Sequence, residues 1–533
     1  MPKLKQWIRV PALAVLVWLA FGPAPAARPN VGPAAASEYT FENCTSLLIG
    51  RLASMDGSTM TSHSCDSGTD RTWMTMEPPR RFPAGAKAKI YNDPKRSKRP
   101  DDPDRLEMGE IPQVAETYAF LNAAYPIMNE MQLAIGETTI GGRSELKSDE
   151  GLLDAPELYR LCLERAKTAR EAIRVLDELT QAYGYNDYGE CFTFADPREV
   201  WFLEIYGPGK GKKGAVWAAQ RVPDDQISVS ANAGRIRKID LKNKDTFLAS
   251  ANITALAMER GLWDAKSGEA FDFTYAYNPG GRTSLGSRRR EWRALSLLAP
   301  SLKLDPNAEN YPFAVKPEKK VGVADLLAIF RDAYDGTPFD MTRTVTAVNR
   351  KGETVKSPVA GPFINGDLKD LLKVVRERTI CSPAATYLQI TQSRGWLPDA
   401  IGGVVWLGYD NPMTTPHTPF YAGITRMPDA YMVDGRWGYR DDSAWWAFRT
   451  VGKLANFRWQ EMSKDIEKVW RAIEDKAFAD QIRIEEDATA LFKKNPAEAK
   501  KFLTDYSVKI AEDAVAAYKK LERDLWTKYN YLF

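Results

Sequence analysis

The chain has 533 residues, of which 44% are hydrophobic, 11% aromatic and 27% charged. This composition is ordinary for a globular protein and leaves ample apolar residues for a large core. The 73 basic and 70 acidic residues nearly cancel, for a formal charge of +3. No basic run is interleaved with aromatic residues, so we do not expect nucleic acid as a partner.

The first residues have the pattern of a secretory signal peptide. Three basic residues precede an apolar run over residues 10–21, and small residues at 24–26 stand at the expected cleavage distance. The run is shorter than the about 20 apolar residues that span a bilayer. We therefore expect residues 1–26 to be a signal peptide, residues 27–43 to be a propeptide or linker, and the mature protein to be exported to the periplasm or the extracellular space without a stable membrane span.

Strand patterns follow directly after this leader. Residues 45–50 and 58–62 are predicted strands, and the Asp56-Gly57 turn between them is a hairpin signal. Prolines and lysines between residues 80 and 105 indicate a surface loop. A further strand is predicted after the turn at Asn129.

Helix pairs and hairpins then alternate along the chain. Helices are predicted at residues 155–166 and 168–184, followed by a hairpin that pairs residues 200–205 with 215–219. Further predicted elements are a helix at 325–334, strands at 386–392 and 403–409, and an almost wholly helical region from 444 onward. Without a repeating βαβ unit, this order favours an α+β layered fold with mainly antiparallel sheets.

Histidine is scarce, with His63 and His417 the two examples in the chain. A Ser-His-Asp or Cys-His pair would have to use one of them, and a zinc site with several histidines is excluded. The motifs HExxH, CxxC and GxSxG do not occur. His417 lies in a loop rich in proline and threonine, where we expect it to be exposed or hydrogen-bonded to backbone. We predict no metal and no cofactor.

Export would permit disulfides between the cysteines at positions 44, 65, 162, 191 and 381. Their odd number leaves at least one thiol free unless a bond forms between chains. Cys162 falls in a predicted amphipathic helix and is expected to be a buried small hydrophobe. Position points to Cys44 as the free thiol.

A cysteine at the start of a mature chain needs no histidine to act as a nucleophile. Its thiol has an ordinary pKa near ~8.5 and its α-amino group one near ~7.7–8.0, so the amine can accept the proton of its own side chain. Such chemistry at Cys44 requires cleavage of the Asn43–Cys44 bond, by self-cleavage or by another protease.

The sequence from Cys44 resembles a known family. Residues 44–50 (CTSLLIG) and 54–60 (SMDGSTM) are similar to the start of the cysteine-type dipeptidases of the N-terminal-nucleophile hydrolase superfamily. Later blocks resemble that family in the same order, up to about residue 460: residues 129–143, 165–172, 195–201, 214–217, 336–340 and 392–398.

The resemblance implies a four-layer αββα sandwich over residues 44–460 with the cysteine at the end of a central strand. It implies hydrolysis of dipeptides through a thioester, without a metal or cofactor. Residues 461–533 would form a helical C-terminal extension that packs on the core or supports a homo-oligomer. Related acylases cut penicillin V and conjugated bile acids with the same apparatus.

Site residues carry over from the resemblance one by one. Asp66 stands where relatives place a carboxylate near the cysteine amine. Asn232 matches an asparagine that donates to the oxyanion, a contact typically worth about 2.7–4 kcal/mol. His63 stands where many relatives have arginine, which leaves a structural or a substrate-side role open.

Three charged residues are candidate substrate-binding groups. Arg290 could bridge the asparagine and the aspartate, bind a carboxylate bidentately, or belong to an exposed basic face with its neighbours. Glu137 and Arg143 could meet the two charged ends of a dipeptide.

The sequence thus predicts an exported cysteine dipeptidase acting on a dipeptide or small amide. The alternatives are an acylase of N-acyl or other amides with the same nucleophile, and a secreted binding protein that keeps the fold without catalysis.

Overall fold

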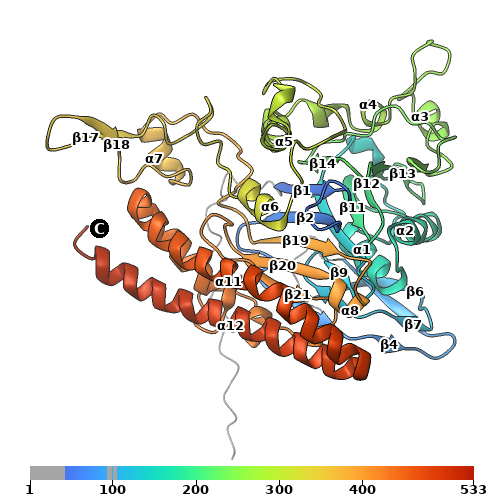
Figure 1. Ribbon diagram of the computed structural model, residues 1–533. Coiled ribbons are helices and arrows are strands. Elements are labelled where there is room, and N and C mark those ends of the chain that lie inside the picture. Colours follow the sequence, from blue (N-terminus) through green and yellow to red (C-terminus); the bar gives the residue numbers. More distant parts are fainter. Residues whose placement is uncertain (1–42, 93–98, 100–104, 533) are drawn as a thin grey trace, which may run out of the picture. The chain divides into compact units, whose positions relative to one another are not determined.

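The computed structural model describes residues 43–92, 99 and 105–532 (Figure 1). The chain divides into two units, residues 1–37 and 38–533, and everything described belongs to the second. The predicted signal peptide and all of the predicted propeptide or linker except Asn43 lie outside the described residues. Within the described part, no helix is long and apolar enough to cross a membrane.

Two large antiparallel sheets dominate the described residues. The first has the strand order β16 (Ala314–Val315), β14 (Ile227–Ser230), β1 (Asn43–Ile49), β2 (Thr59–Asp66), β19 (Tyr387–Ser393), β20 (Val404–Tyr409), β21 (Thr418–Tyr421). The second has the order β15 (Phe247–Ala249), β13 (Val216–Val222), β12 (Val200–Tyr206), β11 (Gly189–Ala195), β10 (Ala134–Thr139), β9 (Met128–Asn129), β8 (Phe120–Asn122), β3 (Thr75–Glu77).

Small two-stranded sheets and a set of helices complete the unit. The small sheets pair β4 (Arg80–Arg81) with β7 (Glu116–Thr117), β5 (Lys87–Asn92) with β6 (Leu106–Pro112), and β17 (Thr346–Val348) with β18 (Thr354–Lys356). The α-helices are α1 (Ala155–Arg165), α2 (Ala169–Tyr183), α3 (Ala255–Glu259), α4 (Phe273–Tyr277), α5 (Leu285–Leu298), α6 (Val323–Phe330), α7 (Gly366–Leu371), α8 (Asp399–Gly402), α9 (Asp429–Met432), α10 (Ala444–Leu454), α11 (Trp459–Lys494) and α12 (Pro496–Tyr529).

Most predicted elements are present near their predicted bounds. The strands β1 and β2, the helices α1 and α2, and the β12–β13 hairpin confirm the sequence patterns. Capping explains where the two helices begin, because the side chains of Asp154 and Thr168 accept hydrogen bonds from backbone nitrogens of the first turns.

The prediction of a surface loop between residues 80 and 105 was wrong in part. Strand β5 lies inside it and pairs with β6. Ala88 and Ile90 are buried while Lys87 and Lys89 are exposed, an alternation of period two that the neighbouring prolines and lysines obscured.

The two large sheets face each other through β1 and β2 on one side and β10 on the other. Gly136 in β10 makes the approach close: a Cβ atom there would lie 2.5 Å from the backbone oxygen of Ser62 and 2.6 Å from Oγ1 of Thr193. Thr61 and Thr193 share a hydrogen bond of 2.6 Å between the sheets. A side chain on β10 can therefore reach the strand that carries Cys44.

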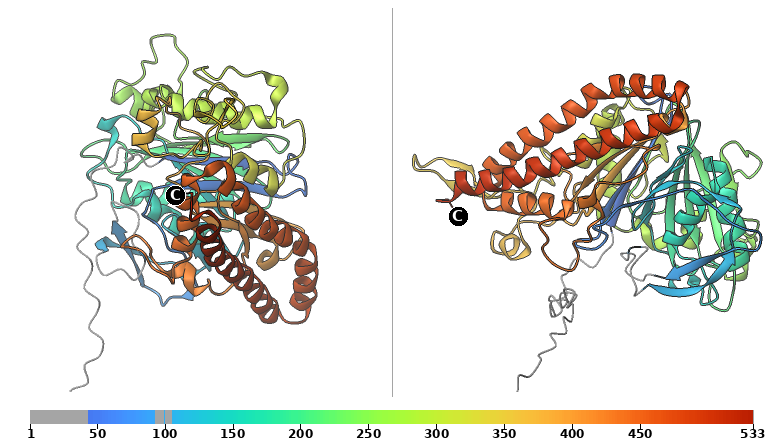
Figure 2. Two further views of the ribbon diagram at one scale, coloured as in Figure 1. Left: turned by 90° about the vertical axis from the view of Figure 1, so that its left-hand side faces the viewer. Right: turned by 90° about the horizontal axis from the view of Figure 1, so that it is seen from below.

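Helices contact both large sheets. Helix α2 contacts β11 and α1 contacts β8 and β9, while α5 contacts β14, and α10 and α12 contact β20 and β21. Helices α11 and α12 run side by side as a long pair (Figures 1 and 2). The prediction of an α+β fold with mainly antiparallel sheets and a helical C-terminal region is confirmed.

A buried carboxylate on α11 contacts residues next to the first sheet. The Glu474 carboxylate lies 2.6 Å from Nη2 of Arg331, and its Oε1 accepts a hydrogen bond of 2.9 Å from the backbone nitrogen of His417. The prediction that His417 is exposed or hydrogen-bonded to backbone was wrong, since its side chain is fully buried and its Nδ1 lies 3.1 Å from the carboxylate of Glu474. The loop composition gave no sign that a helix far along the chain covers it.

The close approach at Gly136 should make the residue intolerant of a methyl group. We expect Gly136→Ala to lower the free energy of unfolding by about 1–3 kcal/mol, because the obstructing Ser62 oxygen is backbone and cannot rotate away. Gly280→Ala is the matched control: a Cβ there meets nothing within 4 Å, and the change should stay within about 0.5 kcal/mol. Urea unfolding of both variants measures this, and equal effects would contradict the packing.

Candidate active site

Cys44 lies near the start of β1, a strand flanked on both sides by β14 and β2. Its side chain is buried, with 1% of the residue exposed. In the ladder with β2, Cys44 stands opposite Cys65 and Asn43 stands opposite Asp66. Asn43 precedes Cys44 in the same strand, so the Cys44 nitrogen is a backbone amide here.

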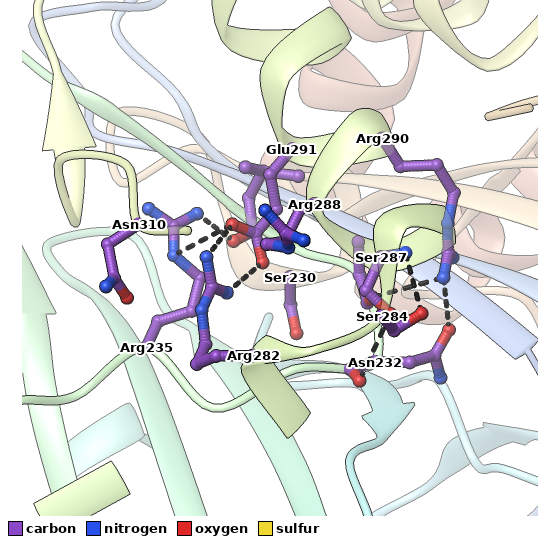
Figure 3. Close-up of polar contacts among 12 residues, drawn as sticks. Ser230, Asn232, Arg235, Arg282, Ser284, Ser287, Arg288, Arg290, Glu291 and Asn310 are labelled. Carbon is purple, nitrogen blue, oxygen red and sulfur yellow. Dashed lines mark hydrogen bonds and ion pairs between the residues drawn. The ribbon is translucent and has the colours of Figure 1, made fainter. Parts of the chain in front are cut away.

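Asn232 and Arg290 hold the backbone of Cys44. The Cys44 nitrogen donates to Oδ1 of Asn232 at 3.0 Å, and Nη2 of Arg290 donates to the same oxygen at 2.8 Å. Nη1 of Arg290 also donates to the Cys44 carbonyl oxygen at 2.6 Å. Figure 3 shows Arg290 reaching down from α5 toward Asn232. The arginine thus fixes both polar backbone groups of Cys44, one directly and one through the amide.

The loop after β14 carries Asn232 in a left-handed conformation, with φ of +60°. Asparagine tolerates this region better than most residues. The buried carboxylate of Glu204 on β12 fixes the loop, because it accepts hydrogen bonds from the backbone nitrogens of Arg235 (2.5 Å) and Ile236 (2.8 Å). The other side-chain group of Asn232, Nδ2, donates to the Thr139 oxygen at 2.7 Å.

A second buried pair fixes α5. Glu291, next to Arg290 in the helix, accepts two hydrogen bonds from Arg282, at 2.7 and 3.0 Å. Figure 3 shows this pair to one side of the Arg290–Asn232 contact. Bidentate pairing of a buried arginine and carboxylate fixes orientation as well as charge, so α5 presents Arg290 in one position.

The thiol of Cys44 faces the second sheet. Its Sγ donates to Oε1 of Glu137 on β10 at 3.1 Å, and Nε2 of His63 on β2 lies 3.0 Å from the same oxygen. The side chains of His63 and Glu137 are fully buried. A carboxylate and an imidazole therefore meet at the Cys44 thiol, brought together from the two facing sheets.

The pKa values in this cluster follow from burial and mutual charge. Burial, followed by the charge of Glu137, holds the pKa of the Cys44 thiol well above its ordinary value. Burial is the largest single effect on His63 and would lower its pKa, but the charge of Glu137 together with hydrogen bonds to Cys65 and Glu137 raises that pKa to about 9. Burial is also the largest effect on Glu137 and would raise its pKa, but the charge of His63 together with hydrogen bonds from His63, Cys44 and Glu190 lowers that pKa. At neutral pH these shifts favour an imidazolium–carboxylate pair beside a protonated thiol.

Asp66 ends β2 beside the start of β1. Its Oδ2 accepts a hydrogen bond from Arg378, whereas Oδ1 is buried without a hydrogen-bond partner among the described residues. Burial raises the pKa of Asp66 to about 6, against the opposing charges of Arg378, Arg290 and His63. Among the described residues, Oδ2 of Asp66 thus accepts a hydrogen bond, and Oδ1 is an acceptor without one.

Of the six residues predicted for the site, Cys44, Asn232, Arg290 and Glu137 are in one hydrogen-bonded group, and Asp66 stands opposite Asn43 at its edge. Arg143 makes its contacts elsewhere: Nε donates to the Ala276 oxygen at 2.7 Å, and Nη1 lies 3.8 Å from Glu145. Sequence reasoning missed Arg378, since a single basic residue in an irregular stretch carries no pattern.

All five cysteines fall within the described residues, and each is a buried free thiol. Cys162 in α1 is fully buried, as predicted for a small hydrophobe. The position of Cys44 at the junction of Asn232, Arg290 and Glu137 sets it apart from the other four.

Comparison with known proteins places the chain in a family. Residues 43–472 match peptidase family C69. A probable dipeptidase of Latilactobacillus sakei is 25% identical over 405 residues, which cover 73% of this chain and 76% of the relative. A dipeptidase of Bifidobacterium longum (strain NCC 2705) is 25% identical over 469 residues, covering 80% and 79%. The family match spans most of the chain, which therefore belongs to peptidase family C69.

Family membership and these names agree with the cysteine at the centre of the site. The protein is an enzyme of the cysteine-type dipeptidase class, as the sequence predicted.

The raised pKa of Asp66 predicts an unusual dependence of stability on pH. Between its ordinary value of 3.8 and about 6, the folded state binds more protons than the unfolded state, so stability falls as pH rises through this window. Asp66→Asn removes the effect. We expect the variant to gain roughly 3 kcal/mol relative to the parent chain across the window, measured by urea unfolding on either side of it.

Asp442→Asn provides the control for this measurement. Asp442 is an exposed carboxylate whose pKa is lowered by the hydrogen bond of Arg440, so its removal should give a small change of the opposite sign. A stability difference for Asp66→Asn that does not vary with pH would contradict the assignment.

Proposed function

We propose that this protein is an exported cysteine dipeptidase that becomes active when the residues before Cys44 are removed. The observation that carries the proposal is the hydrogen bond from the Cys44 nitrogen to Asn232 at the end of a central strand. A fixed backbone nitrogen at this place becomes a fixed α-amine once the Asn43–Cys44 bond is cut. Amine and thiol then share one residue, and no histidine is needed as the base.

In the proposed mechanism the free amine of Cys44 takes the proton of its own thiol. The sulfur attacks the scissile carbonyl of a dipeptide, the first product leaves, and water hydrolyses the thioester. Cleavage of the leader favours this chemistry for an electrostatic reason. In the uncut chain burial and the Glu137 carboxylate keep the thiol protonated, whereas a new ammonium beside the sulfur stabilises a thiolate.

Asp66 is proposed to orient the new amine. It stands opposite Asn43, whose departure would leave the ammonium at Cys44. Its Oδ1 is a buried acceptor without a hydrogen bond among the described residues, and a charge-assisted bond from an ammonium would satisfy it.

Asn232 is proposed to stabilise the oxyanion together with backbone donors. Its Nδ2 carries two hydrogens, and the bond to the Thr139 oxygen occupies one of them. The second hydrogen is available to the charge that develops on the scissile carbonyl. Arg290 is proposed to position Cys44 and Asn232, since its guanidinium nitrogens already donate hydrogen bonds to both residues.

We further propose that the two facing sheets and the helices that contact them form the four-layer αββα sandwich of N-terminal-nucleophile hydrolases. The contacts of α1 and α2 with one sheet and of α5, α10 and α12 with the other are consistent with it. Of the two residues expected to meet the charged ends of a dipeptide, Arg143 is part-exposed and can meet a carboxylate. Glu137 lies against the sulfur, so its contact with the substrate would be at the reacting end.

Cys44→Ala should abolish dipeptide hydrolysis, because it removes the attacking atom. We expect kcat to fall by a factor on the order of 10³ or more, measured with a panel of dipeptides. Cys162→Ala is the matched control: it removes another buried thiol, on α1, whose Sγ donates to the Ala172 oxygen, and it should keep the activity. Hydrolysis by Cys44→Ala protein would refute the nucleophile.

The first residue of the mature protein tests whether the Cys44 amine can be the base. Mass spectrometry of active protein should find a chain that begins at Cys44, because only this cut creates the amine. Active protein that retains the Asn43–Cys44 bond would contradict the mechanism. Cleavage of acyl amino acids in preference to every dipeptide would contradict the substrate class alone.

A further inference from the structure

The proposed mechanism uses the amine and sulfur of Cys44 but gives no chemical task to the side chains that surround the sulfur. Sγ of Cys44, a carboxylate oxygen of Glu137 and a ring nitrogen of His63 all lie within 4.8 Å of one another, and all three residues are buried. Two come from the sheet of β1 and β2, and the third comes from the facing sheet.

We propose that Cys44, His63 and Glu137 form a buried binding site for a borderline divalent metal ion, of which Zn²⁺ is the type, and that the ion reversibly blocks the nucleophile. The ion is an inhibitor in this proposal and takes no part in catalysis.

The distances are close to those of a metal site. Zinc binds sulfur at about 2.3 Å and nitrogen or oxygen at about 2.0–2.2 Å, which places tetrahedral ligand atoms roughly 3.4–3.6 Å apart. The atom Oε1 of Glu137 lies 3.1 Å from Sγ of Cys44 and 3.0 Å from Nε2 of His63. An opening of roughly 0.5 Å per pair, within the reach of small side-chain rotations, would admit the ion.

The imidazole is held by its ion pair with Glu137 and by aromatic contacts. Nε2 of His63 lies 3.0 Å from Oε1 of Glu137. The rings of Tyr125 and Tyr387 contact the imidazole edge to face, with centroids 5.4 and 5.5 Å away. Loss of the imidazolium proton would give the buried ring a nitrogen lone pair, and an ion bound between the three side chains would be coordinated by it.

The charges of the three side chains also suit a divalent ion. A thiolate and a carboxylate supply two negative charges and the neutral imidazole supplies a third donor, so a bound Zn²⁺ leaves the buried cluster without net charge. The thiol proton and any proton on the imidazole pass to solvent as the ion binds, and the sulfur becomes a metal thiolate. Its lone pairs are then engaged by the ion, so it cannot attack a carbonyl.

Loss of activity on metal binding rests on the proposed function, whereas metal binding itself does not. In a chain that begins at Cys44, the free amine would be a fourth donor that closes a chelate with the sulfur. In the uncut chain that nitrogen donates to Asn232, and the three side chains bind alone. The cut chain should therefore bind the ion more tightly.

Titration of the purified, metal-free chain with Co²⁺ tests the site without any activity measurement. We expect one equivalent to bind and a sulfur-to-cobalt charge-transfer band to appear in the near ultraviolet. Cys44→Ala should abolish the band, while Cys162→Ala should keep it, since Cys162 lies on α1, where its Sγ donates to the Ala172 oxygen. A band that persists in Cys44→Ala, or no band in the parent chain, would overturn the proposal.

His63→Gln is the ligand variant, since the amide can still donate to Glu137 but lacks an imidazole nitrogen. We expect it to weaken Co²⁺ and Zn²⁺ binding by more than the roughly 10–100-fold that loss of an outer-sphere partner costs. His417→Gln, the same change at the other histidine, should bind as the parent does. Unchanged affinity in a folded His63→Gln protein would refute the site, and Glu137→Gln serves if that variant does not fold.

Inhibition of dipeptide hydrolysis by Zn²⁺ allows the metal site and the proposed function to be tested separately. Zn²⁺ should abolish dipeptide hydrolysis by the parent enzyme, and EDTA should restore it. An active dipeptidase that micromolar Zn²⁺ leaves unaffected would overturn the metal site alone. A Cys44-dependent cobalt band in a protein that begins at Cys44 and hydrolyses no dipeptide would overturn the proposed function alone.

Discussion

Two hydrogen bonds to one amide oxygen, Oδ1 of Asn232, join parts of the chain that are far apart in sequence. One comes from the Cys44 nitrogen at the start of β1 and the other from Arg290 on α5. The same arginine donates to the Cys44 carbonyl oxygen. Because Glu204 fixes the Asn232 loop and Glu291 fixes α5, the position of the cysteine depends on buried charge supplied by the second sheet and a helix.

Burial of Cys44 also keeps its thiol protonated. Desolvation and the nearby Glu137 carboxylate oppose formation of a thiolate, so a positioned sulfur is not yet a reactive one. Release of an amine at Cys44 would add a positive charge next to that sulfur and reverse the balance. In the proposed mechanism, control of activity by cleavage would follow from electrostatics at one residue.

Much of the fold could be predicted from the sequence, because strand alternation, helix caps and the Asp-Gly turn are local signals. The resemblance located Cys44, Asp66, Asn232 and Arg290 in the chain but could not give their contacts. The meeting of Cys44 with Glu137 depends on how two separate sheets face each other, which Gly136 permits and which no local pattern encodes. Burial of His417 under α11 was missed for the same reason, since its partner Glu474 is 57 residues away.

Ion pairs from the C-terminal helix α11 limit how far the enzyme can be shortened. The family match ends at residue 472, in the middle of α11, yet Glu474 and Glu485 lie beyond it on the same helix. They are the counter-ions of Arg331 and Arg394, which belong to the matched region, at 2.6 and 2.7 Å. A version trimmed to the family boundary would leave the Arg331 and Arg394 guanidinium groups without these carboxylates, so α11 contributes to the charge balance of the region that the family match covers.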